Sequence, residues 1–243
     1  MPCLAIGRRS WNVSGVHPRH LRRRLPPWRW LGVPTSAIPG MITAEEARYY
    51  RWIGQRYRGR GAVVELGCWL GRSTSCLLDG LRRSPGFSGK RLVVVDDFVW
   101  RSSWMDGYYD AADRPANHAS FRALFDRYTA TLAVDLDVRT ARLSPYDGNE
   151  HIQPFAWGGE PIELLVVDCG RTFAVNQGWW DVLAPSFVPR ETLIVMQDWQ
   201  TYRELPPRPY NQTKDFADAH GAALQLEHEL RHGDIGAFRF VGH

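Results

Sequence analysis

Residues Ala62 to Leu81 read AVVELGCWLGRSTSCLLDGL, and this stretch decides the fold. A short apolar run ends at Leu66 and is followed by a turn that holds Gly67 and Gly71. Beyond the turn apolar residues recur at helical spacing, which predicts a strand, a glycine turn and a helix in that order. Glycines let the backbone approach a ligand closely, and the first N–H groups of the helix point at it, so the stretch predicts a nucleotide-like ligand.

Glu65, at the mouth of this turn, narrows the kind of ligand. Its carboxylate would repel a pyrophosphate but attract a cationic amine, so the pattern Glu65, Gly67, Gly71, Ser73 favours S-adenosylmethionine over a dinucleotide. The spacing also matches neither the GxGxxG turn of dinucleotide-binding folds nor the GxxxxGK[ST] turn of P-loops. A tight strand-to-helix connection without a ligand is the alternative, and the rest of the chain has to decide between them.

The bulk properties indicate one α/β domain. With 243 residues, 44% hydrophobic and 23% charged, the chain can fill one core, and a second full domain would be cramped. No apolar run approaches the roughly 18 residues that span a bilayer, and the arginine-rich start lacks the apolar segment of a secretory signal, so we expect a cytoplasmic location. The four cysteines show no CxxC spacing, which favours reduced thiols over a zinc site or a disulfide framework.

The chain divides into an arm over residues 1–40 and a domain over residues 41–243. The arm is rich in arginine, tryptophan and proline, and so many prolines argue against a long helix. Basic residues among aromatic ones are compatible with binding RNA or an acidic substrate. The alternative is that the tryptophans pack on the domain while the arginines stay in water. The net charge of +4 lies largely in the first sixty residues and does not make the whole chain a polyanion binder.

Strands and helices alternate along the domain. A capping box of Thr43 and Glu46 predicts a helix that continues to Gly59. Strands are predicted over 62–66, 91–95, 138–141, 162–167 and 192–196, with helices over 121–132 and 172–187. Two further strands over 224–230 and 237–241 indicate a hairpin. The order predicts an α/β fold with a doubly wound, mostly parallel, seven-stranded sheet and a C-terminal antiparallel hairpin.

Acidic residues follow three of the predicted strands. Asp96 and Asp97 end the second strand, Asp168 follows the fourth and Asp198 the fifth. Ligands of such sheets bind beyond the carboxyl ends of the strands, so we expect Asp96, Asp168 and Asp198 to converge on one cleft. A carboxylate at the tip of the second strand can accept hydrogen bonds from both ribose hydroxyls of a nucleoside. The alternative for Asp96 is a helix cap or a solvated loop acid.

Two loops are expected beside this cleft. The loop 98–118 carries Trp100, Trp104, Tyr108 and Tyr109 and is long for a compact domain, which indicates a lid or an acceptor pocket. The turn over residues 143–146 is expected at the adenine end, where Ser144 and Tyr146 are candidate contacts.

The order of these motifs resembles that of the class I S-adenosylmethionine-dependent methyltransferases, and more narrowly the group around macrocin O-methyltransferase. The resemblance runs from about residue 40 to residue 240 and rests on VVELGCWLGRSTS, LVVVDDF, LLVVDCG and LIVMQDW. It implies a Rossmann-like methyltransferase fold. It also implies methyl transfer from S-adenosylmethionine to a hydroxyl of a small metabolite such as a sugar or a natural-product intermediate. No membrane or nucleic acid is expected as a partner, and a homo-oligomer is compatible with the sequence.

The resemblance also assigns roles to residues. It places Glu65, Gly67, Gly71 and Ser73 at the methionine end of the cofactor and Asp96 at the ribose, and Asp97 and Ser144 complete the expected cofactor-binding set. Asp168 is the expected proton acceptor with Asp198 as its partner. His151 is a further catalytic candidate, and His118 is an alternative to it.

A magnesium ion is an open alternative, because some members of this family hold one between carboxylates at the ends of the fourth and fifth strands. Here Asp168 and Asp198 remain, but Gly170, Arg171 and Gln197 stand where a carboxylate, a histidine and a carboxylate would be expected. Asp168 and Asp198 could still bind a hard cation together with water and substrate oxygens. These altered motifs also permit a cofactor-binding protein without catalysis, and the basic arm permits an RNA-directed methyltransferase.

Overall fold

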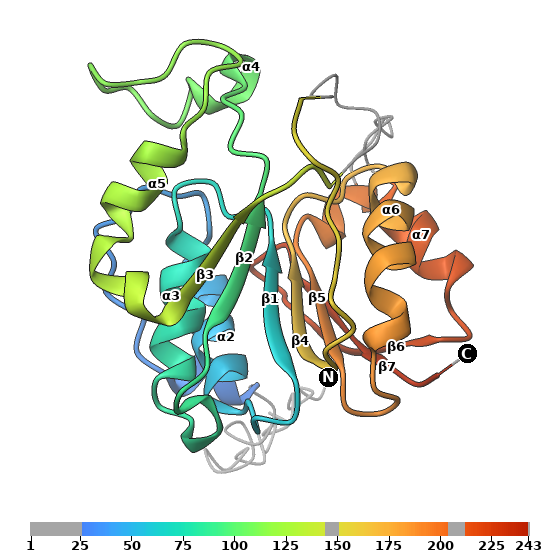
Figure 1. The fold of residues 1–243 in the computed structure, drawn as a ribbon. Helices are drawn as coiled ribbons and strands as arrows, with labels where there is room; N and C mark the ends of the chain where they lie inside the picture. Colours follow the sequence, from blue (N-terminus) through green and yellow to red (C-terminus); the bar gives the residue numbers. More distant parts are fainter. Residues whose placement is uncertain (1–25, 144–150, 204–211, 243) are drawn as a thin grey trace, which may run out of the picture.

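The computed structural model describes residues 26–143, 151–203 and 212–242. Seven strands of these segments form one sheet in the order β3-β2-β1-β4-β5-β7-β6 (Figure 1). Neighbours among the first five strands are parallel, whereas β7 pairs antiparallel with both β5 and β6. The predicted α/β fold and its C-terminal hairpin are therefore confirmed. The strands are β1 (Ala62–Leu66), β2 (Leu92–Asp96), β3 (Leu136–Thr140), β4 (Ile162–Val167), β5 (Leu193–Met196), β6 (Leu224–Glu229) and β7 (Gly236–Phe240).

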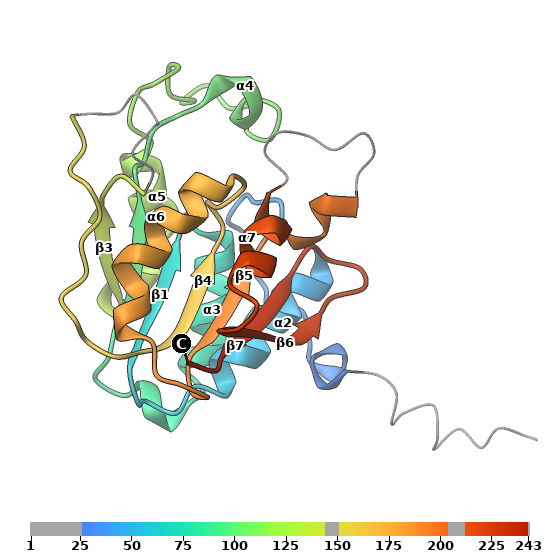
Figure 2. The same cartoon turned by 90° about the vertical axis from the view of Figure 1, so that its right-hand side faces the viewer.

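Helices cover both faces of the sheet. Figures 1 and 2 show α2, α3 and α5 on one face and α6 and α7 on the other. No helix of the described segments is long and apolar enough to cross a membrane. The helices are α2 (Ala44–Gln55), α3 (Arg72–Leu81), α4 (Ser102–Met105), α5 (Arg122–Tyr128), α6 (Phe173–Leu183) and α7 (Thr213–Ala219). Short 3-10 turns are η1 (Pro27–Trp30), η2 (Pro85–Phe87), η3 (Ala130–Asp135), η4 (Ala184–Ser186) and η5 (Trp199–Arg203).

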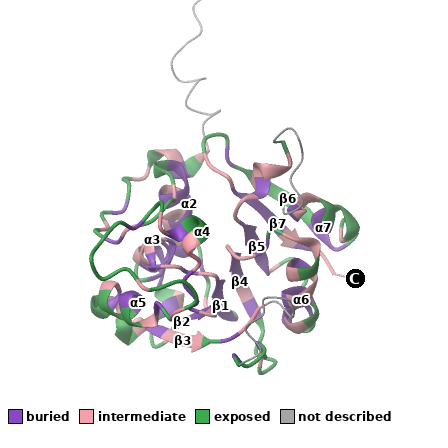
Figure 3. Cartoon of the chain, turned by 90° about the horizontal axis from the view of Figure 1, so that it is seen from above, coloured by how far each residue is buried: buried purple, intermediate pink, exposed green. Residues whose placement is uncertain are grey.

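The central strands are mainly apolar because both of their faces are buried. Along β1 every residue is buried, and the side chains alternate between two cores. Val63 packs in the core under α2 and α3, and Val64 packs in the core under α6 and α7. Seen from above in Figure 3, the middle of the sheet is buried and the exposed residues lie on the outer surfaces of the helices and loops. This burial on both faces explains why the strands read as continuous apolar runs.

Helix α2 begins at the predicted capping box. The Glu46 backbone N–H donates to the Thr43 hydroxyl at 3.2 Å, and the Thr43 backbone N–H donates to the Glu46 carboxylate at 2.5 Å. These two bonds satisfy groups that the first turn of a helix leaves without partners. The capping box also fixes the direction in which Glu46 points, which matters for the site described below.

The structure differs from the sequence prediction in several details. The helices predicted to end near Gly59, at residue 132 and at residue 187 end earlier, at Gln55, Tyr128 and Leu183. Helix α7 lies in a region for which no element was predicted, because seven residues are too few to show a clear period. Strand β3 begins at Leu136, two residues earlier than predicted. The loop 98–118 is not irregular throughout. It contains α4, and its ends pair through the Trp100 N–H to the Ala119 carbonyl at 2.8 Å and the Phe121 N–H to the Phe98 carbonyl at 2.8 Å.

The described part of the arm packs on the domain through Trp28. Its side chain is buried and lies edge-on to Tyr49 and Trp52 of α2, with ring centroids 5.0 and 5.2 Å away. Residues 1–25 lie outside the described residues. The arm therefore contributes at least one large side chain to the core that surrounds α2.

Candidate active site

The strand register places the glycine turn and two carboxylates side by side. Leu66 of β1 pairs with Val95 of β2 and with Val167 of β4. Backbone bonds continue beyond these pairs, from the N–H after Leu66 to the Val95 carbonyl and from the N–H after Val167 to the Leu66 carbonyl, both at 2.8 Å. The residues that follow the three strands at the carboxyl edge are Gly67, Asp96 and Asp168.

The turn after β1 depends on Gly67. This residue has φ of 80°, and a Cβ there would lie 2.8 Å from the Asp168 carbonyl oxygen. Any side chain would therefore be strained and would push β4 away. Gly71, with φ of 94°, occupies the N-cap position of α3, where no described side chain caps the first turn. The glycines thus bring the backbone of the turn and the N-terminus of α3 to the carboxyl edge of the sheet.

Asp96 holds this turn from the neighbouring strand. Its carboxylate accepts hydrogen bonds from the backbone N–H groups of Cys68 at 2.9 Å and Phe98 at 2.8 Å. Burial and the neighbouring charge of Asp97 raise the pKa of Asp96. Asp97 in turn forms an ion pair with Arg101 at 2.5 Å. The two acids at the end of β2 therefore organise the loops after β1 and β2.

A cavity of about 280 Å³ opens over Asp96 and Asp97. Polar and apolar side chains share its wall, which suits a ligand with both a hydroxylated and a planar apolar part. The lining of this cavity includes Gly67, Trp69, Asp96, Asp97, Trp104, Met105 and Phe121.

A second cavity of about 490 Å³ adjoins the first. Trp69 and Asp168 line both cavities, and so do Met41, Cys68 and Arg171. The remaining wall of the second cavity comes from the starts of α2 and α3, the loop after α4, the end of β5 and the turn between β6 and β7. The lining of the second cavity includes Arg72, Ser73, Tyr108, Gln197, Asp198 and Asp234. The two cavities form one hollow with Asp168 between them.

Asp168 is the acid that both cavities share. Burial, followed by the charges of Asp198 and Glu65, raises the pKa of Asp168 well above its usual range, and Arg171 opposes this rise. A buried carboxyl group with a raised pKa binds a proton more tightly than a solvated one. Its position and its environment both suit a proton acceptor.

The end of β5 contributes Gln197 and Asp198, and both side chains are engaged. The Gln197 amide donates to Glu46 at 2.7 Å and accepts from the Tyr50 hydroxyl at 2.7 Å. Asp198 accepts a hydrogen bond from Arg171 Nε within an ion pair. A guanidinium therefore lies on the second carboxylate of the predicted catalytic pair.

Glu65 lies below the glycine turn and has no exposed surface. It accepts a hydrogen bond from the Thr74 hydroxyl at 2.6 Å, and its other oxygen has no partner among the described residues. Burial raises the pKa of Glu65 to about 7, against hydrogen bonds from Ser73 and Thr74 that lower it. Glu65 does not line either cavity. It therefore lies beneath the surface on which the sequence predicts a contact with the methionine end of the cofactor.

The other predicted site residues lie in different environments. Ser73 is buried and lines the second cavity. Ser144 and Tyr146 lie outside the described residues. His118 and His151 are exposed, and neither belongs to the described lining of the two cavities. The roles of these residues stay predictions.

The aromatic loop divides into a packed part and an exposed part. Trp100 and Tyr109 are buried within the loop and lie edge-on to each other. Trp104 and Tyr108 are exposed and lie beside Trp69, with ring centroids 6.0 and 6.4 Å away. Trp104 lines the first cavity and Tyr108 the second, so one loop contributes an aromatic side chain to each.

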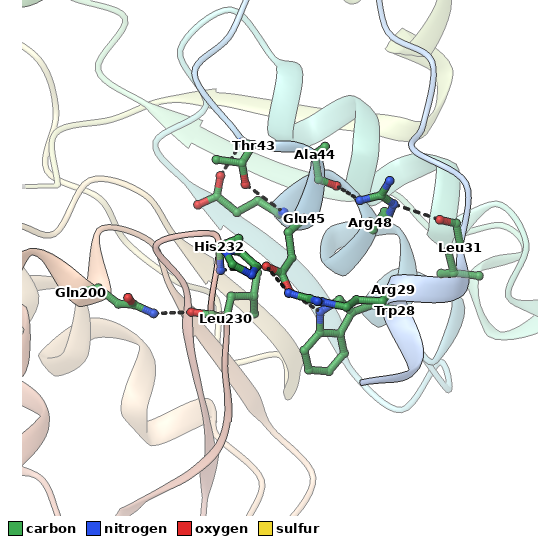
Figure 4. A network of polar contacts seen from close by, with 11 residues as sticks. Trp28, Arg29, Leu31, Thr43, Ala44, Glu45, Arg48, Gln200, Leu230 and His232 are labelled. Atoms are coloured by element: carbon green, nitrogen blue, oxygen red, sulfur yellow. Dashed lines mark hydrogen bonds and ion pairs between the residues drawn. The ribbon is translucent and has the colours of Figure 1, made fainter. Parts of the chain in front are cut away.

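Two glutamates at the start of α2 fasten the wall of the second cavity, and Figure 4 shows one of them, Glu45, with its partners Arg29 and His232. Glu46 accepts the Asp234 N–H at 2.7 Å in addition to its bonds to Thr43 and Gln197. Glu45 accepts the His232 N–H at 2.8 Å and the Arg29 guanidinium at 3.1 Å. We call this set of bonds the glutamate clamp. It ties the turn between β6 and β7 to the beginning of the domain.

The donor set does not fit a magnesium ion. Arg171 lies on Asp198, and the Gln197 amide is committed to Glu46 and Tyr50. Within residues 26–143, 151–203 and 212–242 no three histidine, cysteine, aspartate or glutamate side chains are arranged to hold a metal ion. A hard divalent cation needs several free oxygen ligands, which Asp168 and an ion-paired Asp198 do not supply.

Solved structures with a similar architecture include O-methyltransferases. An O-methyltransferase from Bacillus cereus in complex with SAH matches with a TM-score of 0.53 at 15% identity, covering 86% of this chain and 84% of that chain. The O-methyltransferase NovP matches with a TM-score of 0.54 at 13% identity, covering 84% of each chain. TomG from Streptomyces achromogenes, in complex with SAM, matches with a TM-score of 0.50 at 14% identity, covering 83% and 82%.

This chain has the fold of these methyltransferases. The expected Rossmann-like methyltransferase fold is thereby confirmed. Comparisons with protein-family models and with curated protein sequences gave no match.

The residues of the hollow fit S-adenosylmethionine. Asp96 and Asp97 line the first cavity beside the apolar side chains of Met105 and Phe121, where carboxylate oxygens could accept hydrogen bonds from ribose hydroxyls. Trp69 and Arg72 line the second cavity, and their buried Nε1 and Nε atoms have no hydrogen-bond partner among the described residues. Both are donors, which suits a carboxylate such as that of the methionine moiety. A cationic sulfur bound there would lie near carboxyl groups whose pKa values burial raises, and its positive charge would favour their ionised forms.

Sequence reasoning missed several lining residues. Trp69 was visible inside the glycine turn, and its position two residues after Gly67 is the signal that could have identified it. In the sequence, the only signal at Arg171 is its departure from the family pattern. Met41 and the turn at residues 231–234 carry no motif, because only tertiary contacts bring them to the hollow.

Proposed function

We propose that this chain is an S-adenosylmethionine-dependent O-methyltransferase that acts on a hydroxyl group of a small metabolite. One observation carries the proposal: a continuous hollow at the carboxyl edge of the sheet holds the glycine turn and Asp96 at one end, an aromatic second cavity at the other, and Asp168 between them. A cofactor and an acceptor placed in the two parts would meet at Asp168. Ligands of this kind of sheet occupy that edge.

The first cavity is the proposed adenosine site. Asp96 and Asp97 would accept hydrogen bonds from the ribose hydroxyls, and Trp104, Met105 and Phe121 would pack on the adenine. Asp96 has a double task, because its oxygens already accept the N–H groups of Cys68 and Phe98. The ribose contact and the shape of the glycine turn therefore depend on the same carboxylate.

The second cavity is the proposed site of the methionine end and the acceptor. The cofactor supplies an activated methyl group, so the protein has to align the acceptor oxygen with it and remove one proton. Asp168 is the proposed acceptor of that proton, because it lines both cavities. Tyr108 and Trp69 would pack on the body of the acceptor and exclude water around it.

The acceptor class rests on similarity in fold. NovP and TomG, which share the fold, are O-methyltransferases, and TomG is involved in tomaymycin synthesis. A hydroxylated sugar or natural-product intermediate, as in the macrocin O-methyltransferase group, fits a mixed polar and aromatic cavity of about 490 Å³. No described helix spans a membrane, and the proposed partner is this small molecule.

Calorimetry and mass spectrometry test the proposal together. Isothermal titration should show S-adenosylmethionine and S-adenosylhomocysteine binding to the purified protein. Incubation with methyl-labelled cofactor and a panel of sugars, phenols and macrolides should give a labelled product that gains one methyl group. Cofactor binding without any labelled product across the panel would favour a binding protein that has lost catalysis. Absence of cofactor binding would remove the proposal altogether.

A further inference from the structure

Arg171 contacts one of the two acids between which the resemblance would place a metal ion. Its Nε donates to an oxygen of Asp198, and its side chain lines both cavities together with Asp168. About half of the side chain remains exposed, so a ligand can reach the guanidinium from the hollow. The acceptor end of the hollow therefore contains, beside these acids, a cation that belongs to the chain.

The backbone around Arg171 is fixed from two helices. Gly170, just before it, has no room for a side chain, because a Cβ there would lie 1.9 Å from Oδ1 of Asn176 in α6. The Gly170 carbonyl accepts hydrogen bonds from the Asn176 amide at 3.1 Å and from the Thr213 hydroxyl of α7 at 2.9 Å. The Arg171 carbonyl accepts the Gln212 N–H at 3.0 Å. Contacts with α6, α7 and the residue before α7 thus fix the position of the Arg171 backbone, from which the guanidinium extends.

The partner acid is fixed as well. Asp198 has φ of 55°, an uncommon conformation for a residue other than glycine. Its carbonyl accepts the Thr201 hydroxyl at 2.7 Å, and the preceding residue, Gln197, is held by Glu46 and Tyr50. Because both members of the pair are anchored through their backbones, the ion pair is a built feature and not a chance contact of two mobile side chains.

We propose that the guanidinium of Arg171, held by Asp198, takes the place of a divalent cation in this site and donates a hydrogen bond to the oxygen of the acceptor hydroxyl. This proposal rests on the proposed function above. A guanidinium presents five N–H donors in a planar fork and stays charged at all physiological pH values. It can therefore orient an oxygen and stabilise negative charge on it without any metal.

The reaction that Arg171 assists balances without a further reactant. A lone pair of the acceptor oxygen forms the new bond to the methyl carbon, and the electron pair of the breaking carbon–sulfur bond goes to sulfur. The proton of the hydroxyl goes to the carboxylate of Asp168. Arg171 keeps its own protons, so its role is to position the oxygen and to offset the charge that develops on it.

Metal binding tests the proposal without knowledge of the acceptor. Titration of the wild-type protein with Mn²⁺, followed by electron paramagnetic resonance, should show no bound ion at this site. In Arg171→Ala the acids lose their cation, and the variant should bind Mn²⁺ at least about tenfold more tightly than wild type. Adding Asp198→Asn to this variant should abolish the gain. The matched control is Arg203→Ala, because Arg203 is equally exposed in an ion pair with Glu229.

Activity and cofactor binding complete the test once an acceptor turns over. Wild-type turnover should be insensitive to EDTA, whereas Arg171→Ala should lose about a hundredfold in kcat, the order expected for one donor to a developing oxyanion. Affinity of Arg171→Ala for S-adenosylhomocysteine should stay near that of wild type, and ethylguanidinium should restore part of the activity. Arg171→Lys keeps the charge but not the fork and should fall between the two.

Three outcomes would overturn the proposal. These are Mn²⁺ bound by wild type and lost in Asp198→Asn, no gain of Mn²⁺ in Arg171→Ala, and turnover that EDTA abolishes in wild type. Failure of the proposed function is a separate result, because it would appear as absence of cofactor binding in wild type, while the Mn²⁺ titration would still decide the role of Arg171.

Discussion

The carboxylate of Asp96, at the end of β2, accepts a hydrogen bond from the backbone N–H of Cys68, in the turn after β1, at 2.9 Å. The residue that the motif assigns to the ribose is therefore also a structural support of the glycine turn. If Asp96 binds the ribose as proposed, ribose binding and the shape of the glycine turn are coupled through one side chain.

Asp96→Asn should weaken S-adenosylmethionine binding by about tenfold or more, because an amide cannot accept hydrogen bonds at both of its ends and leaves one buried N–H without a partner. The thermal midpoint should fall as well. Isothermal titration and thermal unfolding measure the two effects. Asp126→Asn, at a surface ion pair with Arg122, is the control and should change neither. An unaltered dissociation constant in Asp96→Asn would remove the ribose assignment.

Glu65 should make the protein less stable as pH rises. Its pKa is about 7 in the folded protein against an ordinary value of 4.5, so the group favours the folded state at low pH and loses this contribution between pH 4.5 and 7. The difference corresponds to about 3 kcal/mol. Urea unfolding of Glu65→Gln should therefore show a gain over wild type that is larger at pH 8 than at pH 5. A gain of the same size at both pH values would contradict the raised pKa. Glu160→Gln, at an exposed position, should show no such trend.

Binding of S-adenosylmethionine should release protons near neutral pH. The sulfonium is a cation, and a cation near Glu65 and Asp168 favours their ionised forms, whose pKa values burial has raised. Affinity should therefore increase as pH rises through 7. Calorimetry in two buffers of different ionisation enthalpy counts the protons. S-adenosylhomocysteine lacks the positive sulfur and should release fewer. Equal proton release with both ligands would show that the acids do not sense the sulfur.

Tyr108→Ala and Trp104→Ala should affect different ligands. Tyr108 is 60% exposed and lines the second cavity, so its loss should raise KM for the acceptor with little change in cofactor affinity. Trp104 is 39% exposed and lines the first cavity, so its loss should weaken the cofactor. Removal of one packed aromatic ring corresponds to a change of about tenfold in each case. Steady-state kinetics and isothermal titration separate the two, and an effect of both variants on the same ligand would contradict the assignment of the cavities.

Glu46→Gln should destabilise the protein by about 1–3 kcal/mol, because the new amide would bring a donor against N–H groups that now share a carboxylate. Those donors belong to Thr43, Gln197 and Asp234. Chemical denaturation measures the loss. Glu191→Gln, in an exposed pair with Arg60, is the matched control and should cost less than about 0.5 kcal/mol. Equal stability of Glu46→Gln and wild type would show that the glutamate clamp contributes little.

The fold could be predicted from the sequence because the central strands β1, β2, β4 and β5 are buried on both faces and read as mainly apolar runs. The capping box of Thr43 and Glu46 could also be predicted, because its two residues lie only three positions apart in the sequence. Helix α7 was not, because seven residues with one fully buried aromatic side chain, Phe216, show no clear period. Local patterns thus predicted the elements with a repeating pattern and missed the short helices α4 and α7.

The site could be predicted only where it follows directly from strand ends. Asp96 and Asp168 reach the hollow because parallel strands in register end together. The engagement of Asp198 by Arg171 depends on residues 27 positions apart and on α7, which was not predicted. The bonds from Glu45 and Glu46 to His232 and Asp234 span still longer separations, and no spacing rule points to them.

The glutamate clamp joins the beginning of the domain to residues 231–234, near the end of the chain. The Asp234 N–H reaches Glu46 across 188 positions of the chain, so closing this contact costs more conformational entropy than pairing the neighbouring strands β1 and β2 does. The wall around the acceptor is therefore expected to form later in folding than the nucleotide end of the hollow.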